Sequence, residues 1–392
     1  MPSGRKTLIL IADDSAVIRT LLRTVVAAAP NLEVVGTAAD GESALNAVEI
    51  LRPDLLLLDV EMPVLNGLNT LRKLRARGHR LPVIMCSSLT QRGAKVTIEA
   101  LASGASDYVA KPSNQTSRDA AVQSLRQELI PKIHALTTAT QPYPLSAGGL
   151  VFPPGPASVR PEASRPSVLV PFPMSAPLPR AQAITSTPTV VVIGVSTGGP
   201  AALDQSLPNI PANFPLPILI VQHMPELFTK LFAERLNGRC HIPVNEASEG
   251  APIQPGTIMI ARGGSHLEIL PSSRSGLPPT AHLTQAPPEN HCRPAVDVLF
   301  RSVVPIWGSG VLAVVLTGMG SDGCIGCRII REHGGSVLAQ NQATSAVWGM
   351  PGAVTNAGLA HRVLPLNAIV PEILRLTSRS LAEASQLREA VI

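Results

Sequence analysis

Apolar and polar positions alternate along the N-terminal part of the chain in a pattern that predicts strands followed by helices. Short apolar runs of strand length end in polar residues, and stretches with an apolar residue every three or four positions lie between them. The predicted strands are 7–15, 32–39, 54–63, 81–88 and 105–112, and the predicted helices are 16–30, 41–53, 66–78, 93–104 and 118–136. Five strand–helix units in series predict an α/β domain with a five-stranded parallel, flavodoxin-like sheet covered on both faces.

A second alternating pattern begins at Thr189. Strands are predicted from there and again at 216–225, 256–264, 309–323 and 336–341, with helical stretches such as 225–237 between them. These strands end in polar or Gly-rich segments. We therefore expect a second, doubly wound and mostly parallel α/β domain, in which ligands bind at the carboxyl ends of the strands.

A proline-rich segment separates the two patterns. Proline fixes φ and lacks an N–H, so neither a helix nor a sheet ladder is expected where prolines recur every few residues. We interpret this segment as a semi-rigid spacer, with a ligand for SH3-type domains as the alternative. The predicted divisions are a first domain at 5–137, a linker at 138–187, a second domain at 188–380 and a C-terminal tail at 381–392, where a short helix is possible from about 378.

Length and composition agree with two domains. The 392 residues exceed what one core usually holds, and 45% hydrophobic against 15% charged residues provides enough apolar material for two. The net charge of +5 is not concentrated in a basic block, which argues against nucleic-acid binding. The chain has no apolar run long enough for a signal peptide or a membrane span, and its five cysteines include only one CxxC, Cys324 to Cys327. We expect a cytoplasmic protein with reduced thiols that pack in its core.

Polar residues follow the strands of the first domain at one sheet edge. Asp13 and Asp14 follow the first strand, Asp59 the third, Ser87 the fourth and Lys111 the fifth. Crowded carboxylates repel one another, and a divalent cation or a lysine relieves the repulsion. Hard oxygen ligands suit Mg²⁺. Once this charge is screened, Asp59 could attack a phosphoryl group, with Ser87 and Lys111 binding the new oxygens.

In this arrangement residues 7 to about 135 resemble a response-regulator receiver domain. The resemblance implies that Asp59 is the phosphoacceptor and that Mg²⁺ binds Asp14, Asp59 and the backbone carbonyl of Glu61, with Asp13 beside them in the metal site. It also implies that Ser87, Tyr108 and Lys111 form the switch that senses phosphorylation.

The segment "GVSTGGP" places Ser196 between glycines directly after a β-branched strand. The pattern G-x-S-x-G is typical of a nucleophilic serine on a tight strand-to-helix turn. A nucleotide-binding loop is a second interpretation, although G-x-G-x-x-G and the P-loop lysine are missing, and a plain helix start is a third. Pro200 suits the first helical turn in all three.

A serine nucleophile needs a base and a carboxylate that orients the base. His223 ends the next strand, and Asp322 lies in the Gly-rich loop after a later one, so both are predicted at the same sheet edge as Ser196. His266 is the alternative base. Asp297 lies in a predicted helix and competes less well for the third role.

Four segments in this order behind a receiver resemble the chemotaxis protein-glutamate methylesterase family: "GVSTGGP", "VQHMP", "LTGMGSDG" and "ATSAVWGMPGAV". The resemblance implies hydrolysis of glutamate γ-methyl esters on chemoreceptors and deamidation of certain glutamines, without a cofactor in this domain. It implies that Ser196 is the nucleophile, His223 the base and Asp322 its orienting carboxylate, with Met319 at the oxyanion pocket. The chain departs from the family pattern at Ser321, where an acidic residue is usual, and in its longer linker.

One chain that carries both a switch and a catalyst suggests how the two are coupled. We hypothesise that the unphosphorylated receiver covers Ser196 and that phosphorylation of Asp59 favours an open form. The partners implied are methyl-accepting chemoreceptors as substrate and a chemotaxis histidine kinase as phosphodonor, with no nucleic acid and no membrane insertion. A response regulator with a non-catalytic binding output domain is the alternative.

Overall fold

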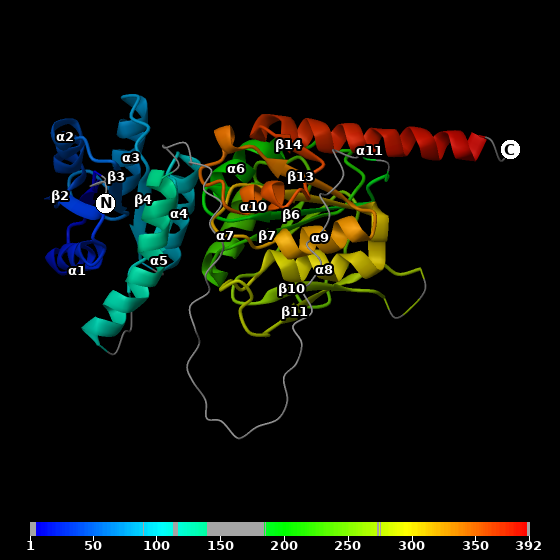
Figure 1. Cartoon of the computed structure of the whole chain (residues 1–392), viewed down its shortest axis with the longest axis horizontal. Coiled ribbons are helices and arrows are strands. Elements are labelled where there is room, and N and C mark those ends of the chain that lie inside the picture. Colours follow the sequence, from blue (N-terminus) through cyan, green and yellow to red (C-terminus); the bar gives the residue numbers. More distant parts are fainter. Residues whose placement is uncertain are drawn as a thin grey trace, which may run out of the picture.

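The computed structural model describes residues 5–88, 90–112, 117–138, 184, 186–272, 274 and 276–389. The described residues leave out most of the predicted linker at 138–187, the last residues of the tail and residue 89. Two α/β units are visible in Figure 1, one at each end of the colour scale.

The first unit is a five-stranded parallel sheet in the order β2-β1-β3-β4-β5. Its elements are β1 Thr7–Ala12, α1 Ala16–Ala27, β2 Leu32–Ala38, α2 Gly41–Leu51, β3 Leu55–Asp59, α3 Gly67–Ala76, β4 Val83–Ser87, α4 Gln91–Ala102, β5 Asp107–Ala110 and α5 Arg118–Thr138. The predicted order of strands and helices is confirmed. Side chains that favour helix N-termini cap the helices, as where Asp40 accepts from Ser43 N at 2.9 Å ahead of α2.

The second unit is a seven-stranded parallel sheet in the order β14-β13-β12-β6-β7-β9-β8. In chain order, its first elements are β6 Val190–Val195, α6 Gly199–Ser206, β7 Ile218–Gln222, α7 Glu226–Asn237, β8 Val244–Glu246 and β9 Ile258–Ile260. The remaining elements are β10 His266–Leu270, β11 Thr280–Thr284, α8 Val296–Trp307, β12 Val311–Val315, α9 Cys324–Glu332, β13 Ser336–Gln340, α10 Met350–Asn356, β14 Arg362–Leu364 and α11 Leu366–Glu389. The antiparallel pair β10–β11 stands outside the main sheet.

Several predicted boundaries differ from the structure. The strand predicted at 309–323 is confined to β12, and its second half is a loop, because Gly318, Gly320 and Gly323 favour a bend over a ladder. The strand predicted at 256–264 is shortened to β9. At the C-terminal end, α11 continues unbroken past residue 381, the first residue of the predicted tail.

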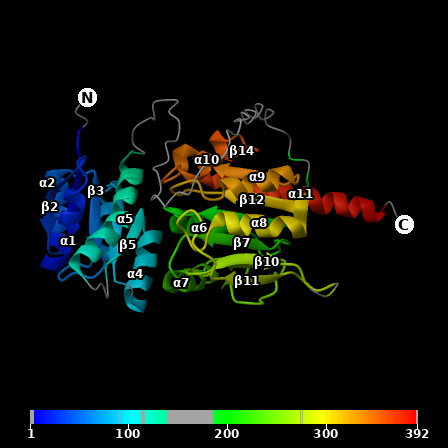
Figure 2. The ribbon, with the colours of Figure 1, turned by 60° about the horizontal axis from the view of Figure 1, so that its bottom comes forward.

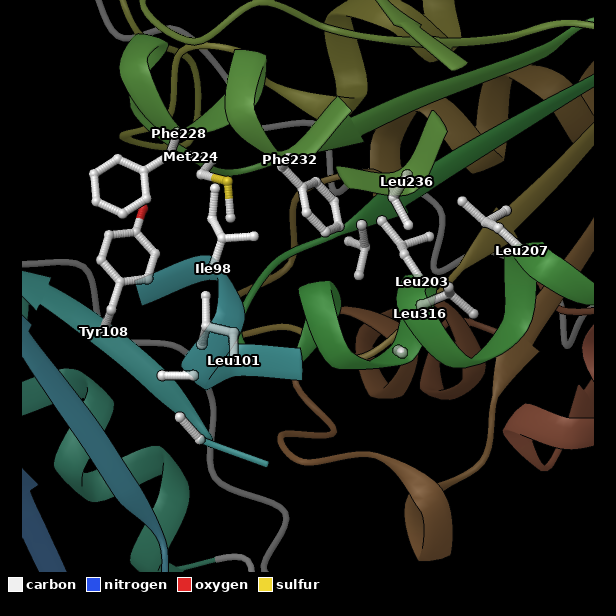
Figure 3. Close-up of a cluster of buried hydrophobic side chains, with 14 of the residues drawn as sticks. Ile98, Leu101, Tyr108, Leu203, Leu207, Met224, Phe228, Phe232, Leu236 and Leu316 are labelled. Atoms are coloured by element: carbon white, nitrogen blue, oxygen red, sulfur yellow. The ribbon is translucent and has the colours of Figure 1, made fainter. Parts of the chain in front are cut away.

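Helices cover both faces of both sheets, and the two units meet through α4 of the first and α6 and α7 of the second (Figure 2). Buried apolar side chains of α4, β5, α6 and α7 belong to one continuous cluster. Figure 3 shows Ile98 and Leu101 of α4 and Tyr108 of β5 facing Met224, Phe228 and Phe232. Among the described residues, no helix has both the length and the apolar character required to cross a membrane.

Candidate functional site

The acidic cluster forms at the carboxyl edge of the first sheet. Asp13 and Asp59 are buried at the ends of β1 and β3, and Asp14 is exposed. Carboxylate oxygens of these three residues lie within 4.8 Å of one another. Lys111 Nζ lies 2.7 Å from Asp13 Oδ2 and 2.7 Å from Asp59 Oδ1, so the predicted lysine does neutralise part of the cluster.

The electrostatics of this cluster reflect its burial. Burial raises the pKa of Asp59 to about 6, and Lys111 only partly opposes that effect. Burial alone would lower the pKa of Lys111, but its hydrogen bonds with Asp13 and Asp59 outweigh burial and raise it. A pocket beside the cluster is lined by Asp14 and Glu61 together with Val60, Met62, Asn66, Arg92 and Val96. An all-oxygen donor set that opens onto a pocket fits Mg²⁺ with its remaining water ligands.

Of the predicted switch residues, Lys111 contacts the acidic cluster and Tyr108 contacts the second domain. Ser87 is buried at the end of β4 next to the cluster, and its hydroxyl donates to Ser88 O at 3.2 Å. Tyr108 is buried in β5 with its ring stacked on Phe228 of α7, at 4.7 Å between ring centroids (Figure 3). Lys132 Nζ of α5 lies 4.9 Å from the centre of the Tyr108 ring. The aromatic switch position is therefore part of the domain interface.

Ser196 follows β6, the central strand of the second sheet. Its neighbour Val195 pairs with Gln222 of β7, and the backbone N–H of His223 donates to Val195 O at 3.2 Å, so the nucleophile and base positions are adjacent across two strands. Gln222 Nε2 donates to Ser196 O at 3.1 Å and fixes that backbone. Gly198 has a φ of 78°, where a Cβ would meet Ala346, so the tight turn at this point requires glycine.

His223 and Asp322 form a hydrogen-bonded pair. His223 Nε2 lies 2.8 Å from Asp322 Oδ2, although 99 residues separate the two in the chain. Burial alone would lower the pKa of His223, but the hydrogen bonds with Asp322 and Cys292 raise it to about 9. Burial disfavours the charge of Asp322, yet the hydrogen bond from His223 and those from the backbone hold its pKa below the usual value. The pair is thus a carboxylate and an imidazole held close to the end of β6.

Backbone groups hold the Asp322 carboxylate. Its oxygens accept from Val296 N at 2.7 Å and Asp297 N at 3.0 Å, at the start of α8, and from Gly323 N at 2.9 Å. A helix N-terminus favours negative charge, which explains why the carboxylate stays ionised although buried. Asp297 itself is turned toward Gly326 N and does not contact His223 through any hydrogen bond in the described residues.

The other predicted residues are placed as follows. His266 is buried, with Nδ1 accepting from Ala295 N at 3.1 Å and Nε2 within 3.1 Å of Pro287 O, so both its nitrogens contact backbone groups. Met319 is 38% exposed in the same loop as Asp322. Cys327 is buried in α9 and Cys324 half-buried, which agrees with the expected role in packing.

Sequence reasoning missed three groups at this site. Asn290 Nδ2 donates to Asp322 Oδ1 at 2.9 Å, and Cys292 Sγ lies 3.5 Å from His223 Nδ1. Thr197, next to Ser196, donates its hydroxyl to Asp107 Oδ2 of the first domain at 2.6 Å. None of these residues ends a predicted strand at the crevice, so the strand-end rule that found Ser196 and His223 gave no reason to select them.

Known proteins resemble this chain in both halves. A family model described as CheB methylesterase matches residues 191–373, and one described as response regulator receiver domain matches residues 9–123. The chain is 50% identical over 371 residues, 95% of each chain, to a protein named protein-glutamate methylesterase/protein-glutamine glutaminase from Nocardioides sp. (strain ATCC BAA-499 / JS614). It is 46% identical over 375 residues to a protein of the same name from Trichodesmium erythraeum (strain IMS101), covering 96% of this chain and 99% of that one.

Solved structures include the CheB methylesterase catalytic domain of Thermotoga maritima, which is 41% identical with a TM-score of 0.47. That match covers 49% of this chain and 100% of the other.

Proposed function

The chain belongs to the CheB family of receiver-linked protein-glutamate methylesterases/protein-glutamine glutaminases, and from this we propose that it demethylates glutamate γ-methyl esters on chemoreceptors and deamidates specific glutamines. The observation that carries the chemistry is the hydrogen bond between His223 and Asp322 beside the strand end that bears Ser196. We place the protein in the cytoplasm, where receptor tails are accessible.

The reaction proceeds by acyl transfer to Ser196. The Oγ attacks the ester carbonyl carbon while His223 Nδ1 takes the hydroxyl proton, since Nε2 is engaged with Asp322. The protonated His223 then gives this proton to the methoxy oxygen, and methanol leaves. A water molecule repeats the sequence on the acyl-enzyme and releases the glutamate carboxylate and free Ser196. Asp322 orients the imidazole and stabilises its charged form.

The first domain supplies the control. Asp59 accepts a phosphoryl group from a chemotaxis histidine kinase, and Asp13, Asp14, Asp59 and the Glu61 carbonyl would hold Mg²⁺, which neutralises phosphoryl charge when bound. Lys111 and Ser87 bind the phosphoryl oxygens in this proposal.

The unphosphorylated receiver covers the esterase crevice in our proposal. Asp107 holds the residue next to the nucleophile, Tyr108 stacks on Phe228, and α4 packs against α6 and α7. Phosphorylation shifts the population toward an open form in which receptor helices reach Ser196. The predicted division into receiver, spacer, esterase domain and tail belongs to the same proposal.

The experiment that tests the chemistry is methanol release from methylated receptor by Ser196→Ala. We expect loss of at least about 10³-fold in kcat, because the nucleophile is removed. Ser309→Ala is the matched control, since this exposed serine lies at the opposite end of β12. Unchanged methanol release by Ser196→Ala would refute the esterase mechanism, and receptor binding without any methanol release by the wild type would favour the non-catalytic alternative.

Covering is tested by comparing the segment from about 185 onward with the unphosphorylated full chain. We expect the segment to hydrolyse ester faster, as phosphorylated full chain also should. If the segment is no faster, the receiver does not act by covering the crevice.

A further inference from the structure

A tight turn at Glu289–Cys292 lies over the His223–Asp322 pair. The backbone N–H groups of Glu289 and Cys292 donate to each other's carbonyls at 3.1 and 2.9 Å. The two central residues, Asn290 and His291, have φ of 53° and 63°. Positive φ at both central positions is the geometry of a type I′ turn, in which asparagine is favoured.

The base of this turn is anchored. Arg301 of α8 holds the Glu289 carboxylate with two hydrogen bonds of 2.6 and 2.7 Å. Arg293 Nη1 donates to the carbonyls of Gln285 and Ala286, both at 3.2 Å. A bidentate arginine–carboxylate pair fixes both distance and orientation, so the side chains that the turn carries are held in place.

Asn290 bridges two carboxylates. Its Nδ2 donates to Asp322 Oδ1 at 2.9 Å and to Asp297 Oδ2 at 3.0 Å. Both acids are buried, and burial raises the pKa of Asp297 to about 6. Two buried carboxyl groups this close repel each other when both are charged, and this repulsion would push Asp322 out of place. The Asn290 amide, which donates to both carboxyl groups, offsets the repulsion.

Cys292 lies beside the His223 imidazole, at the ring nitrogen that Asp322 does not contact. Its Sγ lies 3.5 Å from His223 Nδ1, and Nε2 is taken by Asp322. In the proposed mechanism Nδ1 accepts the proton of Ser196, because Nε2 is engaged with Asp322. Once Nδ1 is protonated, the sulfur can accept its hydrogen, so Cys292 contacts the atom through which the proton passes.

We propose that the turn Glu289–Cys292 is a positioning element for the esterase reaction, in which Asn290 holds the Asp322 carboxylate and Cys292 holds the His223 imidazole at Nδ1. The catalytic role of this turn rests on the proposed function, whereas the contacts of Asn290 and Cys292 are observed in the structure. The groups that face the pair are Asp297 from α8, Asn290 and Cys292 from the turn, and, behind the turn, the Glu289–Arg301 ion pair.

The first test replaces the amide without disturbing the backbone. Asn290→Gly removes the bridge and keeps a residue that adopts positive φ freely. We expect kcat of the full, phosphorylated chain to fall about tenfold, because Asp322 loses the hydrogen bond that holds its carboxylate, with KM nearly unchanged. His291→Gly is the matched control, because His291 shares the turn and the positive φ but its exposed side chain makes no hydrogen bond in the described residues. Equal kcat in the two variants would overturn the role of Asn290.

The second test measures the imidazole itself. Nitrogen-15 NMR of histidine-labelled full chain follows the titration of His223, with the resonance assigned by its loss in His223→Gln. Because the sulfur stabilises the charged ring, Cys292→Ala should lower the midpoint by about one pH unit, and Cys292→Ser, which retains an acceptor, should restore it. The rising limb of kcat/KM against pH should move with the midpoint. Cys240→Ser, a half-buried thiol after α7, is the control.

The two readouts separate this inference from the proposed function. If the wild type releases methanol but the midpoint is the same in Cys292→Ala, the positioning role of Cys292 is wrong and the esterase stands. If the midpoint moves but the wild type releases no methanol, the contact is real and the proposed function is wrong.

Discussion

In the proposed mechanism the chemistry depends on His223, and a polar side chain contacts each of its two ring nitrogens. Asp322 lies on Nε2 and Cys292 on Nδ1, and together they raise its pKa to about 9 against the effect of burial. A base must be neutral to accept a proton. The free enzyme therefore gains active His223 as the pH rises toward 9, and kcat/KM should increase over that range.

Asp322→Asn tests this electrostatic balance. The amide keeps the shape but not the charge, so the pKa of His223 should fall and the rising limb of kcat/KM should move to lower pH. The rate at the plateau should drop by about 10³-fold or more, because the imidazolium loses its counter-charge and the ring its preferred tautomer. Stopped assays of methanol release across pH 5 to 10 measure both effects. A plateau equal to that of the wild type would show that Asp322 plays no part.

The strands and helices that carry the candidate site residues determine where these residues lie. The positions of Ser196, His223 and Asp322 at one sheet edge could be predicted because each follows an apolar run, and adjacent parallel strands place their carboxyl ends together. Asn290 and Cys292 could not, since they sit in a turn whose placement depends on Arg301 and α8. Short strands such as β8 and β14 were missed because three residues give too little periodicity to detect.

On the scale of elements, α5 also supports β5 at the domain interface, through a partly buried lysine. Lys132 Nζ donates to Tyr108 O at 2.6 Å and lies 3.5 Å from Asp107 Oδ1. Burial alone would lower the pKa of Lys132, but Asp107 and Glu128 raise it, so it is charged. Lys132→Met would leave the buried Asp107 carboxylate without its counter-charge.

Lys132→Met should therefore destabilise the first domain by about 3 kcal/mol or more, the usual cost of removing one partner from a buried pair. Urea unfolding followed by circular dichroism measures this loss. Lys6→Met provides the control, because the Lys6–Glu33 pair is exposed and at 3.8 Å. Similar midpoints for the two variants would contradict the argument.

The stack of Tyr108 on Phe228 joins the receiver domain to α7 of the esterase domain. Tyr108→Ala removes an aromatic pair worth about 1 kcal/mol beyond its buried area, so the closed form should lose population. The unphosphorylated full chain should then hydrolyse ester roughly five times faster. Tyr108→Phe keeps the stacked ring and should behave as the wild type. An unchanged basal rate in Tyr108→Ala would separate the stack from the control of activity.

In the proposed mechanism the domain interface couples the phosphorylation site to the esterase site, and coupling between two binding equilibria is reciprocal. Phe228→Leu weakens the closed form from the esterase side and leaves the receiver intact. If this variant raises the fraction of open form, it should both hydrolyse ester faster and bind beryllofluoride, a phosphoryl analogue, more tightly with Mg²⁺ at Asp59. Isothermal titration of the full chain measures that affinity. A faster basal rate with unaltered affinity would mean that the two sites are not linked by this interface.

The sequence suggested contact between the two domains only because one chain carries both of them. Nothing in the spacing of Thr197 and Asp107, 90 residues apart across the proline-rich segment, predicts their hydrogen bond. The contact is set by how two independently patterned units dock, and that depends on surface shape. The organisation within each unit follows from periodicity, which is why the fold of both was predicted correctly.

The central place of β6 has one more consequence. This strand is bonded to β12 on one side and β7 on the other, and its residues are almost fully buried. Amide protons in such a strand exchange with solvent only when much of the domain opens. The backbone that leads to Ser196 is therefore held firmly on both sides, and in the proposed mechanism phosphorylation changes the access of substrate to the serine without moving the serine itself.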